Sequence, residues 1–351
     1  MTTLTCQIAV VGAGPAGSSA ARAAAAAGAR VLLLERRPEV GVPVRCAEYI
    51  PAPLVGQAAV DGDYIVQRTK GMYTFLNGKQ VQYLDTPGCV IQRNCFDKAL
   101  AAGAEAAGAQ LLTKTSVTGY DGTALEARCG ALRLSIRADV VIGADGPHSR
   151  VGRWMGSVNR HCLPAIQKRV ALTRPMEHAE IFFDDDFPGG YGSLFPRGEE
   201  ANVGVAMLPH RSAALRPALE RLLSLLTARG RLRGTSGTFT GGWVPAEGPR
   251  SIVRGNMLLA GDAAGHANAI TGAGVFQAVV GGGIAGKWAA RAALDGDLSL
   301  LRRYEEEWND FYGETLAHAF ARRQLLEGYG GPLQDIFRRC WIGFREYYAP
   351  L

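Results

Sequence analysis

A glycine-rich turn near the start of the chain constrains its fold more than any other feature. It lies between two apolar, β-prone runs, Gln7 to Val11 and Arg30 to Glu35, and it leads into an alanine-rich stretch from Pro15 to Ala27. Two short apolar runs separated by a helix of this length predict a βαβ unit, in which the two strands are parallel. We therefore expect an α/β fold built on a parallel sheet.

The glycines of this turn predict a dinucleotide site. Their spacing is Gly12-x-Gly14-x-x-Gly17, which allows in turn a tight bend, close approach of a pyrophosphate, and close contact between helix and strand. The N-terminus of the helix then faces the phosphates. Glu35 ends the second run, where its carboxylate can accept hydrogen bonds from an adenosine ribose. The fingerprint alone does not distinguish NAD from FAD.

The composition argues against several other classes of protein. The 351 residues carry a net charge of +6, with no run of like charge or motif that would indicate nucleic-acid binding. The seven cysteines include no C-x-x-C pair, so neither a disulfide framework nor a metal site is expected. The expected compartment is the reducing cytoplasm.

One long stretch, residues 263–286, contains no Asp, Glu, Lys or Arg. Glycines and polar residues interrupt it, so we expect a buried loop and helix here rather than a membrane span. A second match to the glycine fingerprint, at Gly281, Gly283 and Gly286, lacks flanking strands and predicts close helix packing instead.

Three later segments favour FAD over NAD. They are Gly143-Ala144-Asp145-Gly146, Gly261-Asp262-Ala263-Ala264, and the Arg93-containing start of a predicted helix at residues 91–97. All three resemble motifs of the para-hydroxybenzoate hydroxylase-like flavoproteins. The resemblance implies that the first supports the pyrophosphate region, that Asp262 binds the ribityl hydroxyls, and that Arg93 lies at the flavin.

Within these flavoproteins, the chain is most similar to the geranylgeranyl reductase family. Residues 261–274 resemble that family's loop beside the isoalloxazine ring, and Tyr191-Gly192-Ser193-Leu194-Phe195-Pro196 resembles its substrate motif Tyr-x-Trp-x-Phe-Pro. The resemblance implies substrate contacts by Tyr191, Ser193, Phe195 and Pro196. Three residues depart from the family pattern: Ser193 replaces a Trp, Ala269 a Pro, and Ala273 an acidic residue.

The fingerprint and the resemblance together give a set of expected cofactor-binding residues. These are Gly12, Gly14, Ala16, Gly17, Glu35, Arg36, Arg45, Cys46, Arg93, Asp145, Gly261, Asp262, Gly272, Ala273 and Gly274.

Two residues are candidate catalytic groups. Cys46 lies where the family has a Cys near the flavin, so it could gate substrate or donate a proton, although a free Cys is often core filler. His266 could donate a proton or could be a structural histidine in the loop. Glu48, two residues after Cys46, is either a functional residue or a salt-bridged residue of the loop.

The expected fold is a Rossmann-like FAD-binding domain, an inserted and mostly antiparallel β substrate domain, and a helical C-terminus. The FAD-binding domain takes residues 1–160 and 250–297, with a possible excursion to the substrate side at 65–90. The substrate domain takes 161–249, and the C-terminal helices take 298–351. Within the last part we expect one long helix from Leu298 to Leu326 and a final one from Leu333 to Tyr347.

The expected function is reduction of carbon–carbon double bonds in an apolar substrate, with NADPH or NADH as the electron source. Two alternatives stay open: a flavin monooxygenase acting on an aromatic compound or a peptidyl Trp or Tyr, and a non-catalytic flavin-binding protein. The basic surface suits an acidic protein substrate. The C-terminal segment 337–345 mixes aromatic and cationic residues, so we expect it to lie on a membrane surface, on a partner, or packed on the flavin domain.

Overall fold

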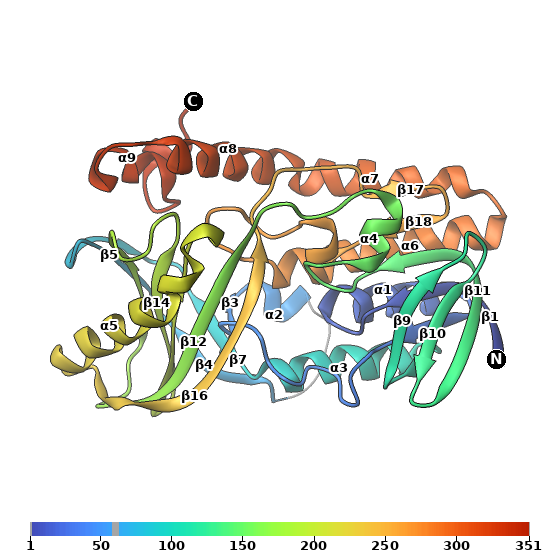
Figure 1. Ribbon diagram of the computed structural model, residues 1–351, viewed down its shortest axis with the longest axis horizontal. Coiled ribbons are helices and arrows are strands. Elements are labelled where there is room, and N and C mark those ends of the chain that lie inside the picture. The colour runs from blue at the N-terminus through green and yellow to red at the C-terminus, as the bar shows by residue number, and fades with distance from the viewer. Residues whose placement is uncertain (1, 58–62, 351) are drawn as a thin grey trace.

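The structure, a computed structural model, describes residues 2–57 and 63–350. Two large sheets lie at opposite ends of the molecule, and a row of C-terminal helices spans them (Figure 1). The expected α/β class, with a Rossmann-like unit, a largely antiparallel second unit and a helical C-terminus, is confirmed.

The first sheet contains the predicted βαβ unit. It has eight strands, and its main path runs β17-β18-β11-β1-β2-β8, with the β9–β10 hairpin attached to β11. The central strands β1, β2 and β11 pair in parallel. The bounds are β1 Thr2–Val11, β2 Val31–Leu34, β8 Gln110–Leu112, β9 Thr115–Tyr120, β10 Leu125–Cys129, β11 Leu132–Gly143, β17 Val253–Arg254 and β18 Met257–Leu259.

Burial along β11 reflects two kinds of partner. Its first half pairs antiparallel with β10 and alternates buried with exposed residues, whereas its last four residues, 140–143, are all buried. This second half lies between the parallel strands β1 and β18, where both faces are covered. One strand thus belongs both to the antiparallel edge and to the parallel centre of the sheet.

The second sheet has seven strands in the order β16-β12-β15-β14-β13-β5-β6. Strands β5 and β6 come from the expected excursion at 65–90, and only the β5–β13 pair is parallel. The bounds are β5 Gly71–Leu76, β6 Lys79–Leu84, β12 Cys162–Leu172, β13 His178–Phe183, β14 Tyr191–Arg197, β15 Glu200–Ala206 and β16 Leu232–Pro245. A small sheet, β3 Tyr49–Pro51, β7 Gly88–Ile91 and β4 Ile65–Thr69, lies between the two large ones.

Different elements cover the two faces of the seven-stranded sheet. Helix α5, Leu215–Ala228, packs its leucines on the face that carries Leu194 and Val203. The opposite face carries Ile181 and Phe195, and it packs against aromatic residues from the end of the chain.

The helices of the first unit stack in one layer, with α1 between α3 and α6 (Figure 1). The bounds of the remaining helices are α1 Pro15–Ala26, α2 Leu54–Gln57, α3 Arg93–Ala106, α4 Arg150–Met155, α6 Val275–Asp295, α7 Arg302–Trp308, α8 Glu314–Gly328 and α9 Leu333–Cys340. Residues 263–274 form the expected loop, which is largely buried up to Ile270 and exposed at Gly272 and Ala273, and α6 is the expected helix. None of the described helices combines the length and apolarity that a bilayer crossing requires.

The expectations for the C-terminal helices were wrong in detail. The expected long helix from Leu298 to Leu326 is a continuous helical run, but it begins as a 3-10 turn and contains a π-helical turn at Asn309–Gly313 between α7 and α8. The final helix ends at Cys340, because Trp341 adopts an extended conformation. This bend lets Trp341 and Phe344 both pack on the seven-stranded sheet.

Helices α1 and α6 cross with almost no space between their backbones. A Cβ atom on Gly282 would lie 2.1 Å from the carbonyl oxygen of Ala16, and one on Gly286 would lie 2.1 Å from that of Ala20. The packing predicted for the second glycine fingerprint is thus confirmed at Gly286 and at Gly281, whose Cβ would meet the Trp308 ring at 2.8 Å. Gly283 faces open space, so the prediction fails there.

This difference gives a matched pair of substitutions. We expect Gly286→Ala to lower the free energy of unfolding by about 1–3 kcal/mol, because the added methyl forces the helices apart. Gly283→Ala should instead raise it by up to about 1 kcal/mol, because alanine favours the helix and meets nothing. Urea denaturation of the two variants, followed by circular dichroism, tests this. Equal effects of both substitutions would contradict the helix crossing.

Candidate functional site

The fingerprint turn packs tightly on one side and is open on the other. A Cβ on Gly12 would lie 2.4 Å from the carbonyl oxygen of Ala144, and one on Gly17 would lie 1.8 Å from that of Gly12. A Cβ on Gly14, at the N-terminus of α1, would meet nothing within 4 Å. The backbone of the turn therefore borders free space at the positive end of a helix, where a pyrophosphate fits.

Glu35 follows β2 and is tied to this turn. One carboxylate oxygen accepts the N–H of Ala13 at 3.0 Å, and the other accepts the N–H of Arg37 at 2.9 Å. Each oxygen keeps a lone pair for a ribose hydroxyl. Arg36 and Arg45 are both exposed, and their contacts with a cofactor stay predictions.

Asp262 lies beside the start of α1, because Gly261 approaches Ala16 so closely that a Cβ on Gly261 would lie 2.8 Å from that of Ala16. No side chain or backbone group of the described residues donates a hydrogen bond to its carboxylate, and the cation that favours its charged form is Arg93. Burial raises the pKa of this carboxyl to about 6, and the Arg93 guanidinium partly offsets the rise. A largely buried carboxylate without donors is a site for the hydroxyls of a polyol.

The Asp262 turn is braced by two residues that the sequence reading missed. Asn159 donates from its side-chain amide to the carbonyl oxygens of Pro147 and Asp262, at 2.7 and 2.8 Å. Arg250 donates to Asn159 at 2.7 Å and to the Ala263 carbonyl at 2.6 Å. These bonds connect the two flavin motifs predicted from the sequence.

Asp145 has a different setting from the one expected. Its carboxylate accepts the Ser149 hydroxyl at 2.5 Å and the Arg150 N–H at 2.7 Å, so it already caps α4. Since Gly12 packs against the backbone of Asp145, we propose that Asp145 supports the phosphate turn rather than binding the cofactor through its side chain.

The loop beside the start of α6 is organised by Asn268. Its side-chain oxygen accepts the N–H groups of Ile270 and Thr271, both at 3.0 Å. Gly272 and Ala273 are exposed at the tip of the loop, and Gly274 precedes the first residue of α6. The loop thus presents backbone groups and a helix N-terminus, as expected for a group that lies against a flavin ring.

Arg93 links this region to the candidate catalytic cysteine. Its guanidinium makes two hydrogen bonds to Asp97, at 3.0 and 3.1 Å. Burial disfavours the charge on Arg93, but Asp97 and the adjacent Cys46 thiol outweigh burial and raise the pKa of the guanidinium. Cys46 and Asp262 therefore both lie beside Arg93.

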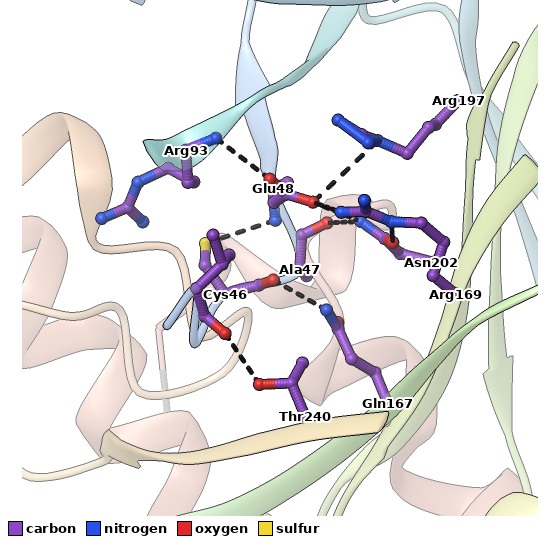
Figure 2. A network of polar contacts seen from close by, with 10 residues as sticks. Cys46, Ala47, Glu48, Arg93, Gln167, Arg169, Arg197, Asn202 and Thr240 are labelled. Carbon is purple, nitrogen blue, oxygen red and sulfur yellow. Dashed lines mark hydrogen bonds and ion pairs between the residues drawn. The ribbon is translucent and has the colours of Figure 1, made fainter. Parts of the chain in front are cut away.

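The segment around Cys46 lies across the seven-stranded sheet (Figure 2). Gln167 donates to the Cys46 carbonyl at 2.8 Å, and Thr240 donates to the Val44 carbonyl at 2.7 Å. Gln167 and Thr240 occupy one row of the sheet, and the pairing continues that row through Gly204 to Ser193. The structure thus brings Cys46 to the face of the sheet that carries Ser193.

The predicted substrate residues divide between the two faces of the sheet. Tyr191, Ser193 and Phe195 alternate along β14 and face the Cys46 segment, where Phe195 stacks on Tyr49 with ring centroids 4.6 Å apart. Pro196 has the parity of Leu194, which packs under α5. The side chain of Pro196 therefore lies on the other face of the sheet from Ser193, and we propose that it packs there in place of the substrate contact expected for it.

His266 is enclosed rather than presented to the site. Its ring stacks on Trp308 with centroids 3.6 Å apart, and within the described part of the chain neither ring nitrogen has a hydrogen-bond partner. Burial holds the pKa of the imidazole well below its usual value. Since a neutral buried imidazole is a poor proton donor, we propose a packing role in place of the catalytic role expected for His266.

A cavity of about 220 Å³ opens beside the Asn268 loop. Its lining combines apolar with charged side chains. The apolar ones include Phe183, Tyr191, Ile270, Leu333, Ile336 and Phe337, and the charged ones are Asp184, Asp185, Arg323 and Glu327. The Tyr191 hydroxyl donates a hydrogen bond to the Thr271 carbonyl, so the wall of the cavity is attached to the predicted flavin loop. Arg323 of α8 donates to the carbonyl oxygens of Ala269 and Gly189, which fixes the C-terminal helices to both sides of this cavity.

Together these groups fit FAD: a phosphate turn, an acceptor for the ribose, an unpaired acceptor for the ribityl chain and a loop for the ring. Groups of His, Cys, Asp or Glu that could hold a metal ion are absent from residues 2–57 and 63–350.

Known proteins share these features. Residues 10–77 match the model of an NAD(P)-binding Rossmann-like domain. The chain is 36% identical over 340 residues to the digeranylgeranylglycerophospholipid reductase of Methanothrix thermoacetophila, which covers 89% of this chain and 85% of that protein. A geranylgeranyl bacteriochlorophyll reductase-like protein from Thermoplasma acidophilum superimposes with a TM-score of 0.86 at 28% identity, covering 93% of this chain and 89% of the other.

A more distant structure, aklavinone-11 hydroxylase with FAD and aklavinone, has a TM-score of 0.68 at 20% identity, covering 93% of this chain and 70% of that one. At this identity the likeness shows a shared fold.

The raised pKa of Asp262 predicts how FAD affinity depends on pH. Ribityl hydroxyls bind the charged carboxylate, so we expect affinity to be highest above about pH 6 and to fall as the pH drops through 6. In Asp262→Asn, the affinity for FAD at pH 7.5 should be at least about tenfold weaker than in the wild type. It should also be nearly independent of pH from about 5 to about 7.5, a range that brackets the pKa of Asp262 at about 6, because the amide does not titrate. Titration of FAD into apoprotein, followed by flavin fluorescence, measures both effects. An identical pH dependence in the two proteins would show that Asp262 has been misassigned.

Proposed function

The chain belongs to the geranylgeranyl reductase family of oxidoreductases, and on that basis we propose that it reduces carbon–carbon double bonds in the prenyl chains of an apolar lipid. The observation that carries this proposal is the cavity attached to the predicted flavin loop, part of whose wall is apolar. A prenyl chain needs apolar contacts, which Phe183, Ile270 and Phe337 supply, and the charged side chains that also line the cavity suit the polar end of a lipid. Bound FAD would supply the hydride, and NADPH or NADH is the proposed source of electrons.

The protein's own part in such a reaction is to hold the chain and to provide a proton. We assign proton donation to the Cys46 thiol, because it lies on the face of the sheet that carries Ser193 and beside Arg93. Ser193 leaves more room on this face than the Trp that the family motif has there, so a bulkier or branched chain fits over it.

The main role of the C-terminal segment is to pack against the seven-stranded sheet. Helix α9 turns Ile336, Phe337 and Cys340 inward, so its apolar side is already covered. Arg338 pairs with Glu346 at 2.6 Å and stacks over the Phe344 ring. Contact of this segment with a membrane surface therefore depends on the remaining exposed cations, Arg339 and Arg345, and on anionic lipid.

The substrate proposal predicts a dependence on the cavity. We expect purified holoprotein with NADPH or NADH to add hydrogen to a geranylgeranyl ether lipid. Leu333→Trp should lower kcat/KM for this lipid about tenfold. The indole would fill part of the cavity and exclude one or two methyl-sized groups of the substrate from it, each of which contributes about 0.8 kcal/mol when buried. Mass spectrometry of the lipid product measures the reaction.

The matched control is Leu225→Trp, which fills a hollow of about 250 Å³ on the α5 side of the same sheet. It should leave kcat/KM unchanged. Hydroxylated product and oxygen consumption, in place of mass gain by two hydrogens, would favour a monooxygenase and overturn the proposal.

The assignment to Cys46 predicts separate effects on the two halves of the reaction. In Cys46→Ala, FAD should stay bound and nicotinamide should reduce it at the wild-type rate, whereas transfer to the prenyl substrate should slow about 100-fold, as expected for loss of a general acid. Anaerobic stopped-flow absorbance separates these steps. A wild-type transfer rate in this variant would leave Cys46 as core filler.

A further inference from the structure

Glu48 is a buried carboxylate in an unusual backbone conformation. The residue is 1% exposed and has a φ of +65°, in the left-handed region that residues other than glycine rarely adopt. It lies two residues after Cys46, between the nucleotide-binding unit and the seven-stranded sheet (Figure 2). A buried charge and a strained backbone at one residue persist only where the surroundings fix both.

The surroundings of Glu48 come from four separate elements. One carboxylate oxygen accepts the N–H of Arg93, the first residue of α3, at 3.0 Å. The other accepts Arg169 of β12 at 2.6 Å and Asn202 of β15 at 3.1 Å, and the Arg197 guanidinium of β14 lies 4.0 Å away. The carboxylate therefore holds the start of α3 against the middle of the seven-stranded sheet.

The backbone of the segment is held by β15 and by β7 of the small sheet. Asn202 also donates to the Ala47 carbonyl at 3.0 Å, and the Glu48 carbonyl accepts the Ile91 N–H of β7 at 2.8 Å. The Glu48 N–H points at the Cys46 sulfur, 3.3 Å away. Any shift of Glu48 would move this N–H and, with it, the surroundings of the thiol.

The groups around Glu48 stabilise a carboxylate at this position better than a neutral side chain. Arg169, Arg197 and the α3 N-terminus all present positive charge or N–H donors to Glu48. A Gln side chain has one acceptor oxygen and two N–H donors, so it can satisfy α3 or the arginine side but not both.

We propose that Glu48 is a positioning residue, which sets the Cys46 thiol between α3 and the seven-stranded sheet. The proposal rests on the role assigned above to Cys46, but the position of the thiol is measurable without any substrate.

The experiment is alkylation of purified holoprotein with iodoacetamide, read by peptide mass spectrometry as the rate at Cys46 relative to Cys129. Cys129 is a half-buried thiol on β10 in the other sheet, so it reports general loosening of the fold. In Glu48→Gln, we expect the ratio of the Cys46 rate to the Cys129 rate to change about tenfold or more, with FAD content unchanged. Arg169→Gln, which removes one partner of the carboxylate from a less buried position, should change the ratio in the same direction by a smaller factor.

Glu180→Gln is the matched control. Glu180 is 2% exposed and pairs with Arg231 at 2.8 Å on the same sheet, but it shares the face of Leu194, away from Cys46. It should lower stability and leave the ratio unchanged. An unchanged ratio in both Glu48→Gln and Arg169→Gln, or an equal change in Glu180→Gln, would overturn the proposal. Failure of the prenyl reductase assay would leave this readout unaffected, so the two results are separable.

Discussion

The structure depends on how closely other backbones approach helix α1. The phosphate turn, the Gly261 turn and helix α6 all come within van der Waals contact of its first two turns, at Gly12, Gly17, Gly261, Gly282 and Gly286. A side chain at Gly12, Gly17, Gly282 or Gly286 would collide with a neighbouring backbone, and one at Gly261 would collide with the Ala16 side chain. This packing brings the two ends of the predicted cofactor site, the phosphate turn and Asp262, to the same end of one helix.

The site is built from buried charges that are only partly paired. Asp97 neutralises Arg93, and Glu48 faces Arg169 and Arg197. Asp262 is stabilised as an anion by Arg93, and no group in the described part of the chain donates a hydrogen bond to its carboxylate. Removing such groups from water costs free energy that the fold must offset elsewhere. An apolar core would be more stable at this position, so the arrangement is better explained by a polar ligand that completes it.

Side chains alternate between the two faces of the seven-stranded sheet, so that one face forms an apolar core and the other faces the candidate site. Leu194 and Val203 point to α5 and form an ordinary apolar core. Ser193, Asn202 and Gln167 point to the opposite face, where they meet the Cys46 segment. The end of the chain closes the rest of that face, since Trp341 packs on Phe183 and donates to Thr74 at 3.1 Å. The aromatic and cationic residues of this segment are thereby committed mainly to packing.

The sequence by itself determined the parts of the protein whose chemistry is local. The βαβ unit, its glycine fingerprint, Glu35 and the Asp262 turn were all predicted, because each depends on residues within about one supersecondary unit. The face of the sheet to which Pro196 points also follows from the alternation of side chains along a strand, although it was not predicted. Only the tertiary structure decided the surroundings of Cys46, because Glu48 meets Arg169 and Asn202 across sequence separations of 121 and 154 residues. It also decided against a catalytic setting for His266, whose partner Trp308 belongs to the C-terminal helices. Sequence patterns report periodicity along one segment, whereas burial and charge pairing depend on which distant segments the fold places together.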